Sequence, residues 1–181
     1  CNSPSFLNCP NLKVIELVYV EDYETDENGK VTYTQTSQAH IATFNGSFFA
    51  GTGIEYFYTS SPEIIFGGHD FENSIIKVVV LDAADITMFG EGDGYGIFSN
   101  AKELKEVWIA GGEDGLYFSE DVFITLDHDI NFYFTEYTYD EVVDMVGDSA
   151  WFTSASEYAH FYFKDNMPAG VEWPEELKSV A

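Results

Sequence analysis

Carboxylates are the residues of this chain most able to carry metal or acid–base chemistry, because 32 of its 181 residues are Asp or Glu. The run Asp127-His128-Asp129 places two carboxylates on one side of an extended strand, and the turn at 111–115 (GGEDG) is also acidic. Oxygen ligands of this kind suit calcium, but neither run has the spacing and terminal Glu of a calcium-binding loop. We therefore interpret both runs as solvated acidic surface, and we expect no metal and no other cofactor.

Nucleophilic and phosphate chemistry find little support in the sequence. The His residues at 40, 69, 128 and 160 are scattered and form no His-Glu-x-x-His zinc motif. No Gly-x-Ser-x-Gly elbow occurs, and Cys9 takes the place of a small buried residue rather than that of a reactive thiolate. The loop 90–96 (GEGDGYG) has the wrong spacing for a phosphate cradle, and its carboxylates would repel phosphate. We expect a protein that is not an enzyme.

The charge balance excludes some classes of partner. Seven Lys and no Arg oppose the acidic residues, which gives a formal net charge of −25. Nucleic acid needs clustered cations, so we exclude it as a partner, and an anionic membrane surface is disfavoured for the same reason. No stretch is long and apolar enough to predict a membrane-spanning helix, so no direct membrane insertion is expected.

A repeat predicts the elements that must position any functional side chain. Each copy starts with a Phe, has a small residue three positions later, and ends in alternating aliphatic residues. The copies start at Phe6, Phe49, Phe71 and Phe98, and a weaker fifth strand follows at 129–134. The first strand-forming residues, Leu12, Ile54, Ile76 and Leu104, are 42, 22 and 28 residues apart, which fits a period near 22 with one interval doubled. The Phe and the small residue would fill the interior of a coil, and stacked coils would align their strands in a parallel sheet.

The doubled interval predicts an insertion. Segments 18–23 and 31–36 alternate with period two around Asn28-Gly29, a strong hairpin turn signal. We expect an inserted β-hairpin over 18–36.

The last part of the chain predicts a covering unit. Thr138 and Glu141 form a capping box for a helix that Gly147 ends, and a strand is expected at 158–163. We therefore divide the chain into a repeat solenoid over 1–137 and an α+β C-terminal cap over 138–181. No matching cap precedes the first copy, so we expect the chain to belong to a longer repeat array.

The repeats resemble a known family. FLNCPNLKVIEL at 6–17, FAGTGIEYF at 49–57 and FSNAKELKEVWI at 98–109 are similar to the BspA-like leucine-rich repeats of bacterial cell-surface proteins. The resemblance covers about residues 5–135, although the second interval lacks a clean copy and the terminal strand is irregular. It implies a leucine-rich-repeat solenoid (α/β superhelix class, strand-rich, with few short helices) and a role in adhesion to host proteins or neighbouring cells.

The strands also predict a ligand surface. If Ile15 and Leu17 point inward from the first strand, Val14 and Glu16 point outward, and the later strands follow the same alternation. The outward residues that we assign to ligand binding are Tyr56, Tyr58, Glu106, Trp108 and Tyr133. Contiguous exposed aromatic residues mark binding surfaces. Two alternatives remain open: loops or another domain cover this face, or a register shift of one residue turns the set inward.

We therefore expect a non-enzymatic, extracellular binding or adhesion module on a bacterial surface. Its ligand would be a protein or a glycan, and acidic residues around the aromatic set would steer a basic partner. One alternative is a structural spacer or accessory domain of a larger surface protein, and another is a carbohydrate-active enzyme with an acidic pair. Cys1 also suits the lipidated end of a lipoprotein, but we favour a start within a longer protein because repeat sequence begins at Phe6.

Overall fold

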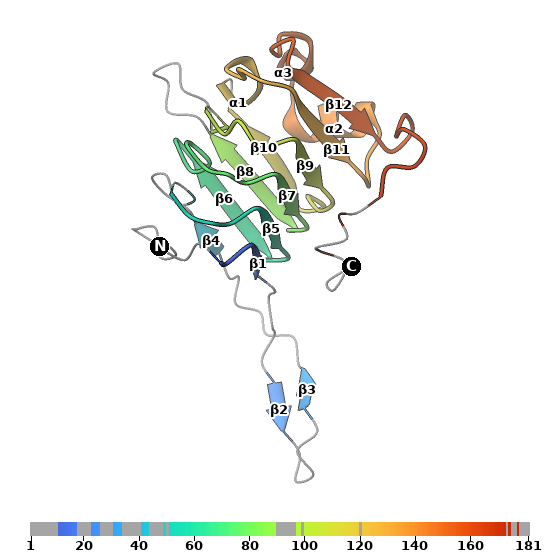
Figure 1. Ribbon diagram of the computed structural model, residues 1–181. Coiled ribbons are helices and arrows are strands. Elements are labelled where there is room, and N and C mark those ends of the chain that lie inside the picture. Colours follow the sequence, from blue (N-terminus) through green and yellow to red (C-terminus); the bar gives the residue numbers. More distant parts are fainter. Residues whose placement is uncertain are drawn as a thin grey trace.

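The computed structural model (Figure 1) describes residues 11–17, 23–25, 31–33, 41–43, 49, 51–89, 97, 98, 100–119, 121–172, 174 and 177. Within these ranges the chain is a strand-rich α/β fold with parallel sheets and a few short helices. Several features of interest in the sequence lie outside the described residues: Cys1, Phe6, Cys9, the hairpin turn at 26–30 and the loop 90–96.

Two parallel sheets form the body of the protein. The six-stranded sheet has the order β1 (Val14–Leu17), β5 (Tyr56–Thr59), β7 (Val78–Leu81), β9 (Glu106–Ile109), β11 (Ile130–Phe134) and β12 (Ala159–Phe163). The four-stranded sheet has the order β10 (Gly115–Phe118), β8 (Asp85–Phe89), β6 (Glu63–Gly67) and β4 (Ile41–Thr43). From β5 to β10 the chain places successive strands alternately in the two sheets, so Figure 1 shows the colours advancing steadily across the molecule.

The second sheet is a finding that the sequence analysis did not anticipate. Its strands alternate in burial, with Ile64 and Phe66 of β6 buried while Ile65 between them is half-buried. The same alternation recurs in Ile86 and Met88 of β8. A strand that buries one face has this period-two pattern in its sequence. The sequence therefore contained the pattern, but over only a few residues.

The core lies between the two sheets. The inward residues of the six-stranded sheet align in register in two rows. One row contains Ile15, Phe57, Val79, Val107 and Phe132, and the other contains Thr59, Leu81, Ile109 and Phe134. All of them are buried, and the inward side chains of β6, β8 and β10 join the same apolar cluster. The predicted inward orientation is confirmed for these residues.

The Phe residues that start the described copies stack on one another. The ring centroids of Phe49 and Phe71 lie 4.9 Å apart, and those of Phe71 and Phe98 lie 5.4 Å apart. The contact continues from Phe98 to Phe132 at 5.8 Å. Each of the three starting rings is at most 1% exposed, which confirms their predicted interior position.

A left-handed residue follows each of these Phe residues by two positions. Gly51, Asn73 and Asn100 have φ values of 66°, 56° and 59°, a region that Gly and Asn adopt most readily. The turn then closes with a backbone hydrogen bond, as between the N–H of Thr52 and the carbonyl of Phe49 at 3.3 Å. The Asn100 amide donates to the Asn73 amide oxygen, which ties neighbouring turns together.

Three short helices complete the described body: α1 (Asp121–Ile124), α2 (Tyr139–Val146) and α3 (Ala150–Thr153). The predicted capping box begins α2. The N–H of Thr138 donates to Glu141 Oε2 at 2.8 Å, and the N–H of Glu141 donates to Thr138 Oγ1 at 3.4 Å. Gly147, at φ 76°, ends the helix as expected. None of the helices in the described ranges has the length and apolarity needed to cross a bilayer.

The structure also contains strands of two further predicted elements. Strands β2 (Tyr23–Thr25) and β3 (Val31–Tyr33) pair antiparallel, which is the pairing that a hairpin over 18–36 requires, and they project from the two larger sheets in Figure 1. The strand expected at 158–163 is β12, which pairs in parallel with β11. This part of the expected cap therefore extends the six-stranded sheet.

Candidate functional site

The outward face of the six-stranded sheet carries the predicted ligand-binding residues. In the strand register, one outward row contains Glu16, Tyr58, Val80, Trp108, Tyr133 and Tyr162. The adjacent row contains Val14, Tyr56, Val78, Glu106, Asn131 and His160. The apolar members of these rows form a cluster separate from the main core, so the predicted set does lie on one face. We call Tyr58, Val80, Trp108 and Tyr133 the outer aromatic face.

Strand spacing brings the aromatic rings into contact. Neighbouring strands lie about 4.8 Å apart, so rings at matching positions are held at stacking distance. The ring centroids of Trp108 and Tyr133 are 4.5 Å apart, and those of Tyr133 and Tyr162 are 5.3 Å apart with an interplanar angle of 21°. The sheet thus preorganises these side chains without needing loops.

The expectation that this face is an exposed platform is wrong for three of the five residues. Tyr58, Trp108 and Tyr133 are only 4%, 3% and 6% exposed. Apolar side chains from the segment that follows β12 belong to the same apolar cluster: Met167, Val171 and Leu177. Burying an aliphatic or aromatic side chain stabilises a fold by about 1.5–3 kcal/mol, so an apolar face of this size favours a cover. The alternative in which another part of the chain covers the face is therefore the observed one.

Tyr56 and Glu106 remain half-buried at the border of the face. Glu106 also has a structural task, because its Oε2 accepts a hydrogen bond from the Trp108 indole N–H at 2.9 Å. The indole N–H would otherwise be desolvated without a partner. The predicted acidic residue is thus brought together with the predicted Trp.

Asp82 is a site residue that sequence reasoning missed. It follows β7 directly, and its Oδ2 accepts a hydrogen bond from the Tyr58 hydroxyl at 2.8 Å. Burial and this bond raise the pKa of Tyr58 to about 12, which keeps the phenol a neutral donor. Burial also raises the pKa of Asp82, and the Tyr58 hydrogen bond opposes that shift. The sequence feature that could have indicated Asp82 is its position as a single carboxylate directly after an apolar strand.

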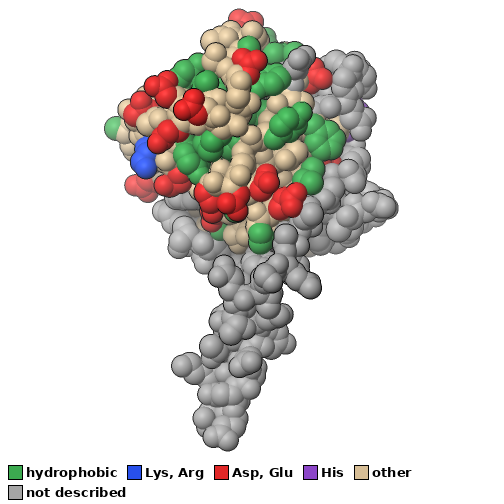
Figure 2. Space-filling model, turned by 180° about the vertical axis from the view of Figure 1, so that it is seen from behind, with side chains coloured by type: hydrophobic (Ala, Val, Ile, Leu, Met, Phe, Trp, Pro, Cys, Tyr) green, Lys and Arg blue, Asp and Glu red, His purple; other side chains and the backbone are tan. Residues whose placement is uncertain are grey.

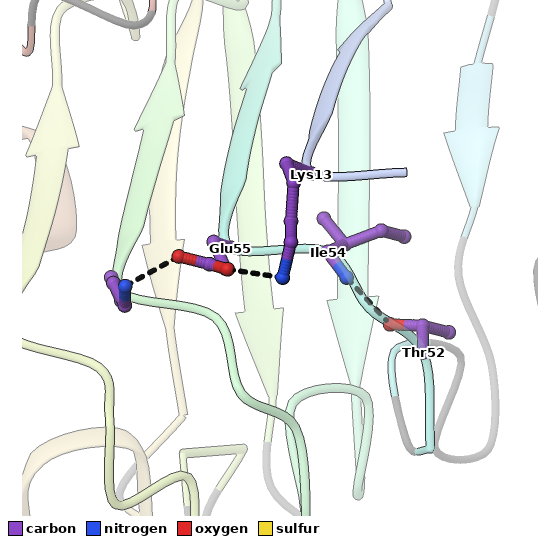
Figure 3. A network of polar contacts seen from close by, with 5 residues as sticks. Lys13, Thr52, Ile54 and Glu55 are labelled. Carbon is purple, nitrogen blue, oxygen red and sulfur yellow. Dashed lines mark hydrogen bonds and ion pairs between the residues drawn. The ribbon is translucent and has the colours of Figure 1, made fainter. Parts of the chain in front are cut away.

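A row of charges lies where the strands of the same sheet start. Lys13, Glu55 and Lys77 directly precede β1, β5 and β7, and both Lys ammonium groups donate to the Glu55 carboxylate. Figure 3 shows Glu55 reaching toward Lys13, beside the Ile54 N–H that donates to the Thr52 hydroxyl at 3.5 Å. Hydrogen bonds from the two Lys lower the pKa of Glu55 to about 2. This row spans the starts of three neighbouring strands, and no local sequence pattern indicated it.

The two carboxylates of the acidic run at 127–129 contact different His side chains. Asp127 Oδ1 lies 2.6 Å from His128 Nδ1, whereas Asp129 Oδ1 lies 2.9 Å from His160 Nε2. In the part of the chain that the structure describes, no group of three or more His, Cys, Asp or Glu side chains is placed to hold a metal ion. His160 belongs to β12, and both side chains of its contact with Asp129 are exposed.

Carboxylates are the main charged groups on the face of the molecule seen in Figure 2. Figure 2, which views the molecule from behind, shows Asp and Glu side chains spread among apolar ones and very little Lys. Comparison with protein-family models, with curated proteins and with solved structures gives no match for this chain.

Proposed function

We propose that this chain is a non-enzymatic binding module built as a leucine-rich-repeat solenoid of the BspA-like kind. The parallel strands support the solenoid. The recurring turns, in which Gly or Asn stands two positions after a Phe, support it too. The stacked Phe residues of successive copies support it as well, because each coil of a solenoid seals the next.

The observation that carries the binding proposal is the in-register outward row of the six-stranded sheet. It holds Tyr58, Trp108 and Tyr133 in fixed geometry, with Tyr56 and Glu106 half-exposed beside them. Preorganised aromatic side chains lose little entropy on binding and are typical anchors for protein and glycan ligands. The acidic border would steer a basic partner and would weaken binding as salt rises.

We place this module outside the cell, on a bacterial surface, because the repeats resemble those of surface adhesins. A net charge of −25 argues against nucleic acid as a partner.

A second candidate function is a structural spacer or accessory domain. The burial of Tyr58, Trp108 and Tyr133 favours it, since a face covered by the chain's own residues offers less contact area to a ligand. The two candidates differ in whether the border of this face binds anything.

The test is a binding screen of the purified chain against arrays of extracellular proteins and of glycans. Any hit is then measured with Tyr56→Ala and Glu106→Gln, where Gln keeps the acceptor for Trp108 and removes the charge. Tyr117→Ala is the matched control, because Tyr117 is 57% exposed on the other sheet. We expect affinity losses of about tenfold for the first two variants and none for the control. Equal affinity for all three variants would refute this face as the binding surface, and an array without hits would favour the spacer.

A further inference from the structure

β12 is the last strand of the six-stranded sheet, and in the described part of the chain no strand pairs with its other side. An edge strand presents backbone N–H and C=O groups with which another chain can pair. On the paired side, the Ile130 N–H of β11 donates to the Tyr158 carbonyl at 2.9 Å. Parallel pairing uses every second residue of a strand for each neighbour, so the residues that alternate with Tyr158 along β12 turn their backbone groups the other way. The residues whose backbone groups face the open edge are Ala159, Phe161 and Phe163.

Local hydrogen bonds occupy part of this edge. The Ala159 N–H donates to the Ser156 carbonyl at 2.9 Å. The Phe163 N–H donates to Asn166 Oδ1 at 2.5 Å, and the Phe163 carbonyl accepts a bond from the Asn166 N–H at 3.0 Å. The Ala159 carbonyl and both backbone groups of Phe161 form no hydrogen bond with any described residue. The edge is therefore open at its centre and closed at Phe163.

The turn that follows β12 places Asn166 for this contact. The backbone bond from the Asn166 N–H to the Phe163 carbonyl spans three residues, as in a β-turn, and returns the chain to the strand that it has just left. A short amide side chain can then reach a nearby backbone N–H. Asn166 is exposed, so its side chain fills no space in the core. Its contact with Phe163 is therefore its only polar bond through the side chain in the described ranges.

A second copy of this chain has the groups that complement the edge. Two β12 strands related by a two-fold axis would pair antiparallel, and with Phe161 opposite its own copy the two Phe161 residues would exchange N–H···O bonds. In the same register, each Phe163 N–H would lie opposite the open Ala159 carbonyl of the other copy. The pairing therefore has only the Phe161 bonds while Asn166 holds Phe163, and it gains one bond from each copy once Phe163 is released.

We propose that Asn166 closes the β12 edge against a second copy of this chain, by holding the Phe163 N–H that would complete antiparallel pairing of two β12 strands. Repulsion between copies that each carry a net charge of −25 acts in the same direction. Charge repulsion acts at every surface, whereas the Asn166 contact acts at one strand and specifies which pairing is prevented. This closure operates whether or not the outer aromatic face binds a ligand.

The test compares full-length chains that differ in one side chain. Asn166→Ala removes the Oδ1 acceptor and frees the Phe163 N–H, whereas Asn166→Asp keeps an acceptor oxygen and is the matched control. Thr138→Ala removes the side-chain cap of α2, so it destabilises the fold without opening the β12 edge. Sedimentation velocity over a range of concentrations measures self-association, at moderate salt to screen the repulsion between copies. Circular dichroism melts establish that each variant is folded.

We expect Asn166→Ala to self-associate at least about tenfold more tightly than the wild type, because each copy contributes one further hydrogen bond. Asn166→Asp and Thr138→Ala should sediment like the wild type. Amide hydrogen exchange followed by NMR tests the edge without any substitution. In the wild type, the Phe161 N–H should exchange quickly and the Phe163 N–H slowly. In associated Asn166→Ala, the Phe161 N–H should become slow.

Several results would overturn the inference. If Asn166→Ala sediments like the wild type, the Asn166 side chain does not control the edge. If Asn166→Asp associates as tightly as Asn166→Ala, the effect does not come from loss of the acceptor oxygen. If Thr138→Ala associates equally, lost stability rather than an open edge is the cause. A slowly exchanging Phe161 N–H in the monomeric wild type would show that the centre of the edge is not open.

Discussion

Replacing Phe71 by Ala should remove a large part of the stability of this protein. The ring is 1% exposed, and it contacts Phe49 at 4.9 Å, Phe66 at 5.0 Å and Phe98 at 5.4 Å between centroids. A buried Phe→Ala substitution costs about 3–5 kcal/mol in lost transfer energy and cavity formation. Three aromatic neighbours place the expected cost at the upper end, since each such pair adds about 0.5–1.5 kcal/mol. A domain of this size has a free energy of unfolding of about 5–15 kcal/mol, so the loss is readily measured.

The assay is urea unfolding followed by circular dichroism, with the midpoint and the slope fitted separately. Phe71→Leu should lose about 1–2 kcal/mol, because it keeps most of the volume but not the stacking. Tyr117→Ala, on the surface of β10, should stay within about 0.5 kcal/mol of the wild type. A loss below about 1 kcal/mol for Phe71→Ala would refute the view that stacked Phe residues hold successive copies together.

Three further substitutions test other parts of the fold. The pKa of Glu55 is lowered in the folded state from its ordinary value of 4.5 to about 2. The ionised Glu55 side chain therefore contributes its full share of the folding stability above pH 4.5, and this share is lost as the pH falls toward about 2. Glu55→Gln should flatten the pH dependence of the melting temperature in this window. Gly111→Ala should prevent stable folding, because the new Cβ would lie 2.1 Å from the backbone oxygen of Ala83, and a soluble, cooperatively melting variant would contradict this. Thr138→Ala should cost about 1 kcal/mol by removing the side-chain cap of α2, measured by urea unfolding, and Thr138→Ser should restore it.

Local sequence signals predicted the parts of this fold that depend on neighbouring residues. The Phe copies, the inward and outward alternation of the strands and the capping box at Thr138 all follow from spacing over a few positions. The left-handed turns at Asn73 and Asn100 belong to the same class, although the sequence analysis did not single them out.

Features that depend on distant residues were not predictable in this way. The Lys13–Glu55–Lys77 row joins positions that only the strand register brings together. The segment after β12 has no periodicity, so nothing in Met167 or Leu177 indicated that they would join the apolar cluster of the outer aromatic face. The predicted binding residues therefore lie together on the outward face, as the strand alternation predicted, but their exposure depended on a tertiary contact.

The most direct test of the central claim is whether a ligand reaches Trp108. The full chain would be labelled with 5-fluorotryptophan in a Trp173→Phe background, which leaves one fluorine signal on the outer aromatic face and one from Trp151 of α3. Titration with a ligand identified in the array screen should shift the Trp108 signal, because Glu106 of the proposed binding surface accepts the Trp108 indole N–H, and should leave the Trp151 signal in place. An unmoved Trp108 signal at saturating ligand, or a shift confined to Trp151, would contradict the account.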